Sequence, residues 1–126
     1  MIVAIDVGLR RIGVAFGYNN SIAIPADPII RDNRKNAAMK LSKLLKENGA
    51  TKLIVGIPKG GSSEDEMKRR IEHFVSLIDF NGDIVYVDES FSTFEAQNLA
   101  TFSSKKKDGK RDSLAAMIIL QRYFGL

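Results

Sequence analysis

Three acidic residues lie where segments of the sequence begin or end, and their chemistry suggests a metal site. Asp6 closes the first apolar run, Glu89 follows a later one next to Asp88, and Asp112 opens the final helical segment. Clustered carboxylates repel one another unless a cation neutralises them, and hard oxygen ligands select Mg²⁺ or Mn²⁺. Two such ions about 4 Å apart can activate water against a phosphodiester. The pattern therefore predicts metal-dependent cleavage of nucleic acid, with Asp6, Glu89 and Asp112 as both metal ligands and catalytic residues.

The residue types that the chain lacks fit the same chemistry. The sequence contains no cysteine and one histidine, so a thiol nucleophile, a disulfide framework and the common zinc sites lack their residues. A bound metal would then have oxygen ligands. The histidine, His73, lies on the polar side of a helical segment, and we expect it on the surface.

The three acids also have a purely structural interpretation, which the spacing leaves open. With fifteen acidic residues among 126, several fall at element ends by chance and cap helices or terminate strands there. This interpretation applies most directly to Asp112. An Asp in the first turn of a helix is favoured by the helix dipole whatever its function.

The N-terminal part of the chain has the pattern of three short strands in a meander. Apolar runs at 2–5, 12–16 and 22–24 are separated by glycine, asparagine and proline. Residues 17–20 have the composition of a hairpin turn that tolerates positive φ. Residues 28–32 are expected to be irregular.

The rest of the sequence alternates between helical and strand patterns, which we recognise from apolar periodicity and from capping and stop signals. The predicted elements are a helix at 36–48, a strand at 53–57, a helix from about residue 63, a strand at 84–87, a helix from about residue 92 and a helix at 112–124. Their order is βββαβαβαα.

This order predicts an α/β fold with a five-stranded mixed sheet. Crossovers through a helix join parallel strands, whereas tight hairpins join antiparallel ones. Helices should cover both faces, and residues 1–126 are expected to form one domain. In such sheets a ligand site forms outside the carboxyl ends of the parallel strands, which is where we expect the acidic residues to meet.

Two groups of basic residues accompany the acidic ones. Arg10 and Arg11 lie between Gly8 and Gly13, where a tight turn would let them approach a phosphate backbone. The second group directly precedes Asp112 and consists of Lys105, Lys106, Lys107, Lys110 and Arg111. We predict that both groups bind nucleic acid. The alternatives are an ordinary hairpin with solvated arginines and a solvated charged loop.

The net charge and the N-terminus are consistent with this prediction. Nineteen basic residues against fifteen acidic ones give a charge of +4, which favours a polyanionic partner. The chain begins without a basic leader or the apolar stretch of a signal peptide. The longest apolar run, residues 114–120, is far shorter than the roughly 20 residues that cross a bilayer. We expect a cytoplasmic protein that does not bind membranes.

Four segments resemble the RuvX/YqgF family of Holliday-junction-resolvase-like proteins. The resemblance spans almost the whole chain and keeps the order of the family's motifs. The matching segments are DVGLRRIGVA at residues 6–15, IVGIP at 54–58, DESFST at 88–93, and DSLAA at 112–116 with ILQ at 119–121.

This resemblance implies a ribonuclease H-like fold and a nuclease that uses Mg²⁺ or Mn²⁺. It implies maturation of the 5′ end of pre-16S rRNA during ribosome biogenesis, with resolution of branched DNA as the alternative. By match of position, Asp6, Glu89 and Asp112 take the catalytic acidic places. The family pattern generally has Arg where this chain has Ser90. Serine cannot pair bidentately with a phosphate or a carboxylate as a guanidinium does.

Two functions of other classes remain open. A non-catalytic ribosome-assembly factor would keep the fold and bind RNA without cutting it, and Ser90 is compatible with that. An actin-like ATPase shares the Asp-x-Gly turn but closes two domains over ATP, and the 56–62 loop lacks the ending of a phosphate loop. Monomer and homodimer are both open, because a junction resolvase makes paired cuts whereas an RNA trimmer can act alone.

Overall fold

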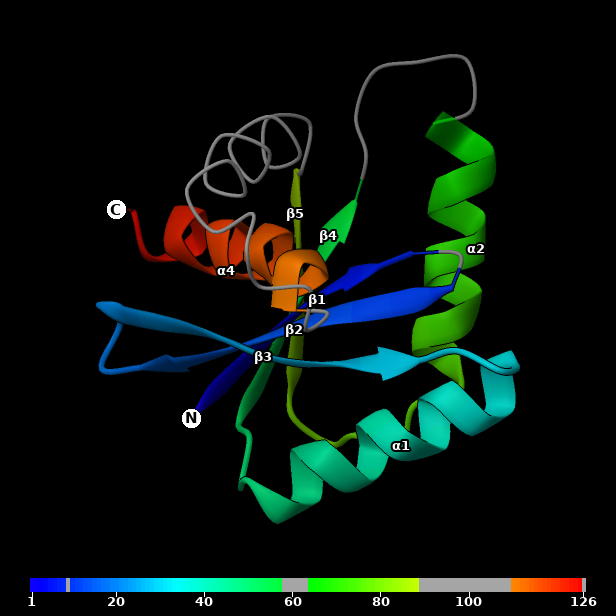
Figure 1. Ribbon diagram of the computed structural model, residues 1–126, viewed down its shortest axis with the longest axis horizontal. Helices are drawn as coiled ribbons and strands as arrows, with labels where there is room; N and C mark the ends of the chain where they lie inside the picture. The colour runs from blue at the N-terminus through cyan, green and yellow to red at the C-terminus, as the bar shows by residue number, and fades with distance from the viewer. Residues whose placement is uncertain (9, 58–63, 89–109, 126) are drawn as a thin grey trace.

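A computed structural model describes residues 1–8, 10–57, 64–88 and 110–125, with the side chains of residues 64 and 110–112 left undescribed. Figure 1 shows the arrangement of its helices and strands. They are β1 (Ile2–Val7), β2 (Arg11–Tyr18), β3 (Ile22–Ile30), α1 (Arg34–Glu47), β4 (Lys52–Ile57), α2 (Glu64–Ser76), β5 (Asp83–Asp88) and α4 (Lys110–Phe124). The helix predicted from residue 92 lies outside the described residues.

The five strands form one mixed sheet in the order β3-β2-β1-β4-β5. β1 pairs antiparallel with β2 and β2 with β3, whereas β1 pairs parallel with β4 and β4 with β5. The hairpins and crossovers expected from the sequence are thus confirmed. β1 is the central strand, so its carboxyl end has two strands on either side of it.

The third strand is much longer than the sequence pattern suggested. It spans Ile22–Ile30, so the predicted strand start at residue 22 is confirmed, whereas its predicted end at residue 24 and the irregular chain predicted at 28–30 were wrong. The register of β2 with β3 shifts between the pair Ile12–Ile29 and the pair Val14–Ala26, which leaves one extra residue on β3. Pro28 lies in this bulge on an edge strand, where its missing N–H is tolerated.

Helix α1 begins two residues earlier than predicted because Asn33 caps it. The Asn33 side chain accepts a hydrogen bond of 2.7 Å from the backbone N–H of Asn36, as is typical of an N-cap. The predicted helix stop at Gly49 is confirmed, since this residue has a φ of 62° just past the helix.

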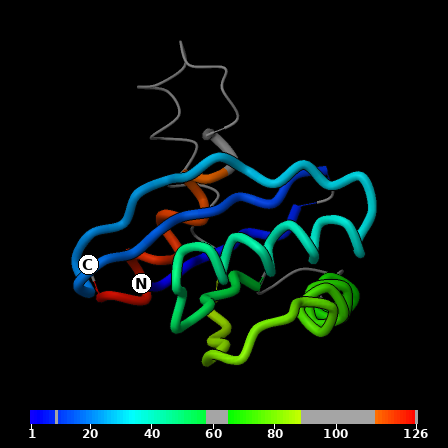
Figure 2. Tube along the Cα trace, turned by 90° about the horizontal axis from the view of Figure 1, so that it is seen from below, coloured from blue at the N-terminus to red at the C-terminus, as the bar shows by residue number. Residues whose placement is uncertain are grey.

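Each face of the sheet has its own hydrophobic core. On one face, residues such as Val3, Ile5 and Val14 pack with Leu41 of α1 and Phe74 of α2. On the other face, Ala4, Ala15 and Ile54 pack with Ala116, Ile119 and Leu120 of α4. Figure 1 shows α4 above the β2–β3 hairpin and α1 below it, and Figure 2 shows α1 and α2 together on one side. The prediction of helices on both faces is therefore confirmed.

Among the residues that the structure describes, none of the helices has the length and hydropathy of a membrane-spanning segment.

Candidate functional site

Asp6 lies near the carboxyl end of β1 and on the side of the sheet that α4 covers. It is half-buried, and its Cα is paired across the sheet with Gly13 of β2. Side chains alternate along a strand, so Asp6 faces the same way as Ala4, which belongs to the α4 core. The sheet therefore fixes the backbone of Asp6, while its carboxylate keeps access to solvent.

A buried hydrogen bond holds the first turn of α4 beside Asp6. The Val14 N–H donates to Ser113 Oγ at 3.1 Å, and Ser113 is fully buried. Val14 follows Gly13, the cross-strand partner of Asp6, and it lies at the irregularity between β2 and β3. The backbone of residue 112, next to Ser113, is thereby brought close to β1. The side chain of Asp112 lies outside what the structure describes.

The end of β5 lies in the same region but two strands away from β1. Ile5 of β1 is level with Val55 of β4, which is level with Tyr86 of β5, so β1 and β5 are about 10 Å apart. The Asp88 carbonyl accepts a 2.9 Å hydrogen bond from Arg122 Nη1, which ties β5 to α4. Glu89, the next residue, lies outside the described part of the chain.

Strand alternation separates Asp88 from Asp6. Val87 packs with the α4 core, so the side chain of Asp88 starts from the opposite face of the sheet. This placement does not support a joint role of these two carboxylates at one metal.

The β1–β2 turn brings two of the predicted basic residues to the same end of the sheet. Arg10 and Arg11 are both exposed there. Gly8 donates its N–H to the Arg11 carbonyl at 3.0 Å, and a Cβ on Gly8 would lie 2.6 Å from that oxygen. Gly8 is thus required by a close backbone approach rather than by a positive φ.

The second basic group is described only in part. Lys110 and Arg111 form the first turn of α4, next to residue 112, but their side chains are not described. Lys105, Lys106 and Lys107 lie outside the described residues. The predicted surface position of His73 is confirmed, since its side chain is exposed.

Within the described ranges, no three acidic or histidine side chains are close enough to one another to hold a metal ion. The side chains of Glu89 and Asp112, two of the three predicted ligands, lie outside what the structure describes. Asp6 and the position of residue 112 are near each other through the Ser113 hydrogen bond, and carboxylate oxygens suit Mg²⁺ and Mn²⁺. Asp6 thus offers the ligand type that such a site needs, and the three-carboxylate metal site stays a prediction.

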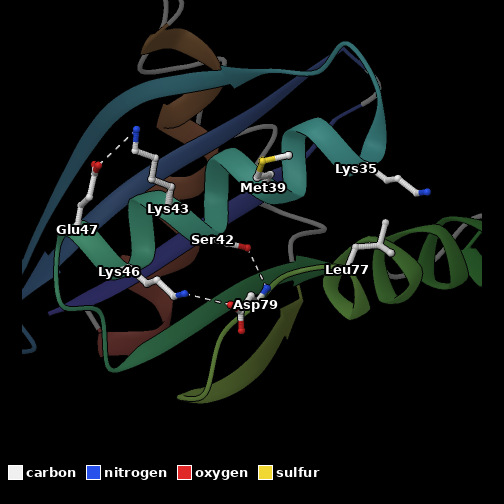
Figure 3. Close-up of a pocket in the computed structure, with 8 residues that line it drawn as sticks. All are labelled: Lys35, Met39, Ser42, Lys43, Lys46, Glu47, Leu77 and Asp79. Carbon is white, nitrogen blue, oxygen red and sulfur yellow. Dashed lines mark hydrogen bonds and ion pairs between the residues drawn. The ribbon is translucent and has the colours of Figure 1, made fainter.

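A groove of about 630 Å³ lies on the other side of the molecule, between α1 and the segment that follows α2. Figure 3 shows Lys46 reaching Asp79 and Ser42 bridging to the backbone of Asp79. These contacts connect α1 to the chain that leads into β5. The groove contains no residue of the predicted site.

The sequence matches the model of a known protein family. The model of the family described as "RuvX: Holliday junction resolvase" matches residues 1–125. The chain belongs to the RuvX family. This membership confirms the resemblance seen in the motifs and makes the protein a hydrolase that cleaves phosphodiester bonds.

Two Campylobacter proteins are similar to this chain over nearly the whole length of both partners. A protein of Campylobacter lari named "Putative pre-16S rRNA nuclease" is 54% identical over 98% of this chain and 97% of its own. A Campylobacter jejuni protein with the same name is 52% identical, with 98% of each chain covered.

The fold is also that of a solved resolvase structure. The structure titled "T. thermophilus RuvC in complex with Holliday junction substrate" superposes with a TM-score of 0.56, covering 98% of this chain and 92% of that one at 10% identity. At this identity the likeness shows the fold alone, and it confirms the ribonuclease H-like class.

Proposed function

We propose that this RuvX-family chain is a divalent-metal-dependent nuclease that matures the 5′ end of pre-16S rRNA. The observation that carries the proposal is the buried Val14–Ser113 hydrogen bond, which places the first turn of α4 next to Asp6. This contact supports the proposal that two acidic residues distant in sequence, Asp6 and Asp112, come together at the carboxyl end of β1. The names of the Campylobacter relatives support RNA as the substrate.

Asp6, Glu89 and Asp112 are the residues proposed to hold two Mg²⁺ or Mn²⁺ ions. When bound, these ions supply Lewis-acid activation of water and stabilise the charge on the phosphodiester. The chain contributes the carboxylate oxygens and a rigid frame for them. Asp6 is held by a central strand and residue 112 by a helix anchored through Ser113, and such rigid support keeps ligands in a productive geometry.

The basic residues are proposed to hold the nucleic-acid backbone beside these acids. Arg10 and Arg11 are exposed on the turn that follows β1. The second group directly precedes or begins α4 and comprises Lys105, Lys106, Lys107, Lys110 and Arg111. Contacts of this kind position a strand without reading its bases.

The test is hydrolysis of a structured pre-16S RNA fragment by the Asp6→Asn variant in Mg²⁺ and in Mn²⁺. We expect activity to fall at least about a hundredfold, because losing a carboxylate lowers the affinity for the metal and weakens the stabilisation of the transition state. Asp83→Asn is the matched control, since Asp83 is exposed at the opposite end of the sheet, at the start of β5. Removing divalent ions with EDTA should abolish cleavage by the wild-type protein.

Full activity of Asp6→Asn, with an unchanged melting temperature, would refute this mechanism. A four-way DNA junction belongs in the same assay, because the family model is described as a Holliday junction resolvase. Cutting of the junction but not of the RNA would favour the resolvase function. Salt-sensitive RNA binding that is indifferent to Asp6→Asn, with no cleavage in any divalent ion, would identify a non-catalytic assembly factor.

A further inference from the structure

Two arginines close in sequence, Arg31 and Arg34, gather with the distant Arg70 on the α2 side of the β1–β2 turn. Arg31 directly follows β3, Arg34 begins α1, and Arg70 lies in α2. Figures 1 and 2 both show the carboxyl end of β1, the start of α1 and helix α2 at the same end of the molecule. We call Arg31, Arg34 and Arg70 the arginine cluster.

Two of these guanidinium groups are oriented by neutral partners. Arg31 Nη1 donates to the Gly8 carbonyl at 2.6 Å, and Arg31 Cζ lies 5.7 Å from the centroid of the Phe74 ring. Arg34 Nη1 lies 3.1 Å from His73 Nδ1. Because arginine has only donors, that ring nitrogen must accept. These contacts fix the side chains without cancelling their charge.

The positive charge of the arginine cluster is compensated only in part. Within the described ranges, neither Arg31 nor Arg34 forms an ion pair with a carboxylate. Arg70 Nη2 lies 2.7 Å from Glu66 Oε1, in a pair whose side chains are 46% and 64% exposed, and such exposed pairs are weak. The cluster therefore has the charge that an anion would neutralise.

The arginines also influence one another. Burial, together with the charges of Arg34 and Arg70, lowers the pKa of Arg31 from its usual value. A guanidinium nevertheless stays charged near neutral pH. An anion bound between the three groups would relieve this repulsion, and planar guanidinium groups match the oxygens of a phosphate.

We propose that the arginine cluster binds the phosphate backbone of the nucleic-acid substrate on the α2 side of the β1–β2 turn. This rests on the proposed function and extends it. Asp6 and the first turn of α4 lie on one side of the turn and the cluster on the other, with the exposed Arg10 and Arg11 between them. A substrate strand is held on both sides of the turn, so it must extend beyond the bond that is cut.

The test compares binding of two double variants to a fluorescein-labelled single-stranded RNA of about 20 nucleotides. Arg34→Gln/Arg70→Gln removes two charges from the cluster and leaves Arg31, which braces the turn at Gly8. Lys43→Gln/Lys46→Gln is the matched control, because these positions lie about 14 and 18 Å further along α1. Fluorescence anisotropy without divalent ions, over a range of KCl concentrations, gives the affinity and its salt dependence.

We expect the arginine variant to bind about tenfold more weakly at 0.1 M KCl. The slope of log K against log salt should fall by about 1.4, because each lost phosphate contact on a single strand contributes about 0.7. The control should keep the wild-type slope. If the double variant melts at a lower temperature, Arg70→Gln alone still tests the proposal, with an expected slope change of about 0.7.

The two proposals can fail independently. Wild-type affinity and slope in the arginine variant would overturn the arginine cluster as a phosphate site, even if Asp6→Asn loses cleavage. Weakened binding in the arginine variant, with full cleavage by Asp6→Asn, would leave the phosphate site intact and refute the metal mechanism.

Discussion

The hydroxyl of Ser113 helps to position the proposed catalytic residues through a buried hydrogen bond. It accepts the backbone N–H of Val14 across 99 residues of sequence, at a position with no exposure to solvent. A buried backbone N–H needs a partner, because leaving it unpaired costs its full desolvation. Ser113 therefore holds the start of α4, and with it residue 112, against the sheet.

Replacing Ser113 by alanine should lower the free energy of unfolding by about 1–3 kcal/mol, because the Val14 N–H loses its partner in a buried site. Urea denaturation measures this change. Ser76→Ala is the control, since Ser76 Oγ donates to the His73 carbonyl in an exposed position, and its effect should be close to zero. Equal stability of the two variants would show that the Val14 hydrogen bond is not important.

At the scale of the element, α4 forms a core with the sheet and also positions the candidate site. Its buried residues Ala116, Ile119 and Leu120 pack on β1, β2 and β4, and its Arg122 holds the carbonyl at the end of β5. A shift of this helix would move residue 112 relative to Asp6. Packing of α4 and activity should therefore change together.

Leu120→Ala should cost about 2–5 kcal/mol of stability, as expected for a fully buried leucine. Nuclease activity should fall at temperatures where the variant is still folded, because the first turn of α4 loses its fixed position. Met39→Ala is the control, since Met39 is 67% exposed. A Leu120→Ala variant with normal stability and activity would contradict this account of α4.

At the scale of the whole molecule, the two faces of the sheet carry different parts of the proposed site. The α4 face carries Asp6, and the α1–α2 face carries the arginine cluster beside the same turn. A single chain thus presents both parts of the proposed site. The prediction of an RNA trimmer that can act as a monomer is compatible with this arrangement.

We expect the rate of RNA cleavage to rise linearly with protein concentration, and sedimentation velocity to show a monomer at the same concentrations. Paired cutting of a four-way junction needs two active sites, so its rate should rise more steeply at low protein concentration. RNA cleavage that appears only when a dimer forms would contradict a monomeric mechanism.

The sequence by itself determined the α/β class, the order of the described elements and the position of Asp6 near the end of the first strand. These features depend on local patterns: apolar periodicity, turn residues and caps, which act within a few residues of one another. The family motifs were also visible in the sequence. The roles of Glu89 and Asp112 stay predictions.

Only the tertiary structure decided the length of β3, the partner of Val14 and the gathering of three arginines. The β3 bulge depends on pairing with β2, so the sequence pattern predicted irregular chain at 28–32 when the edge position of Pro28 was unknown. Arg31, Arg34 and Arg70 show no common motif, because the sheet and two helices bring them together. Such contacts depend on how distant elements pack, and no local pattern encodes that packing.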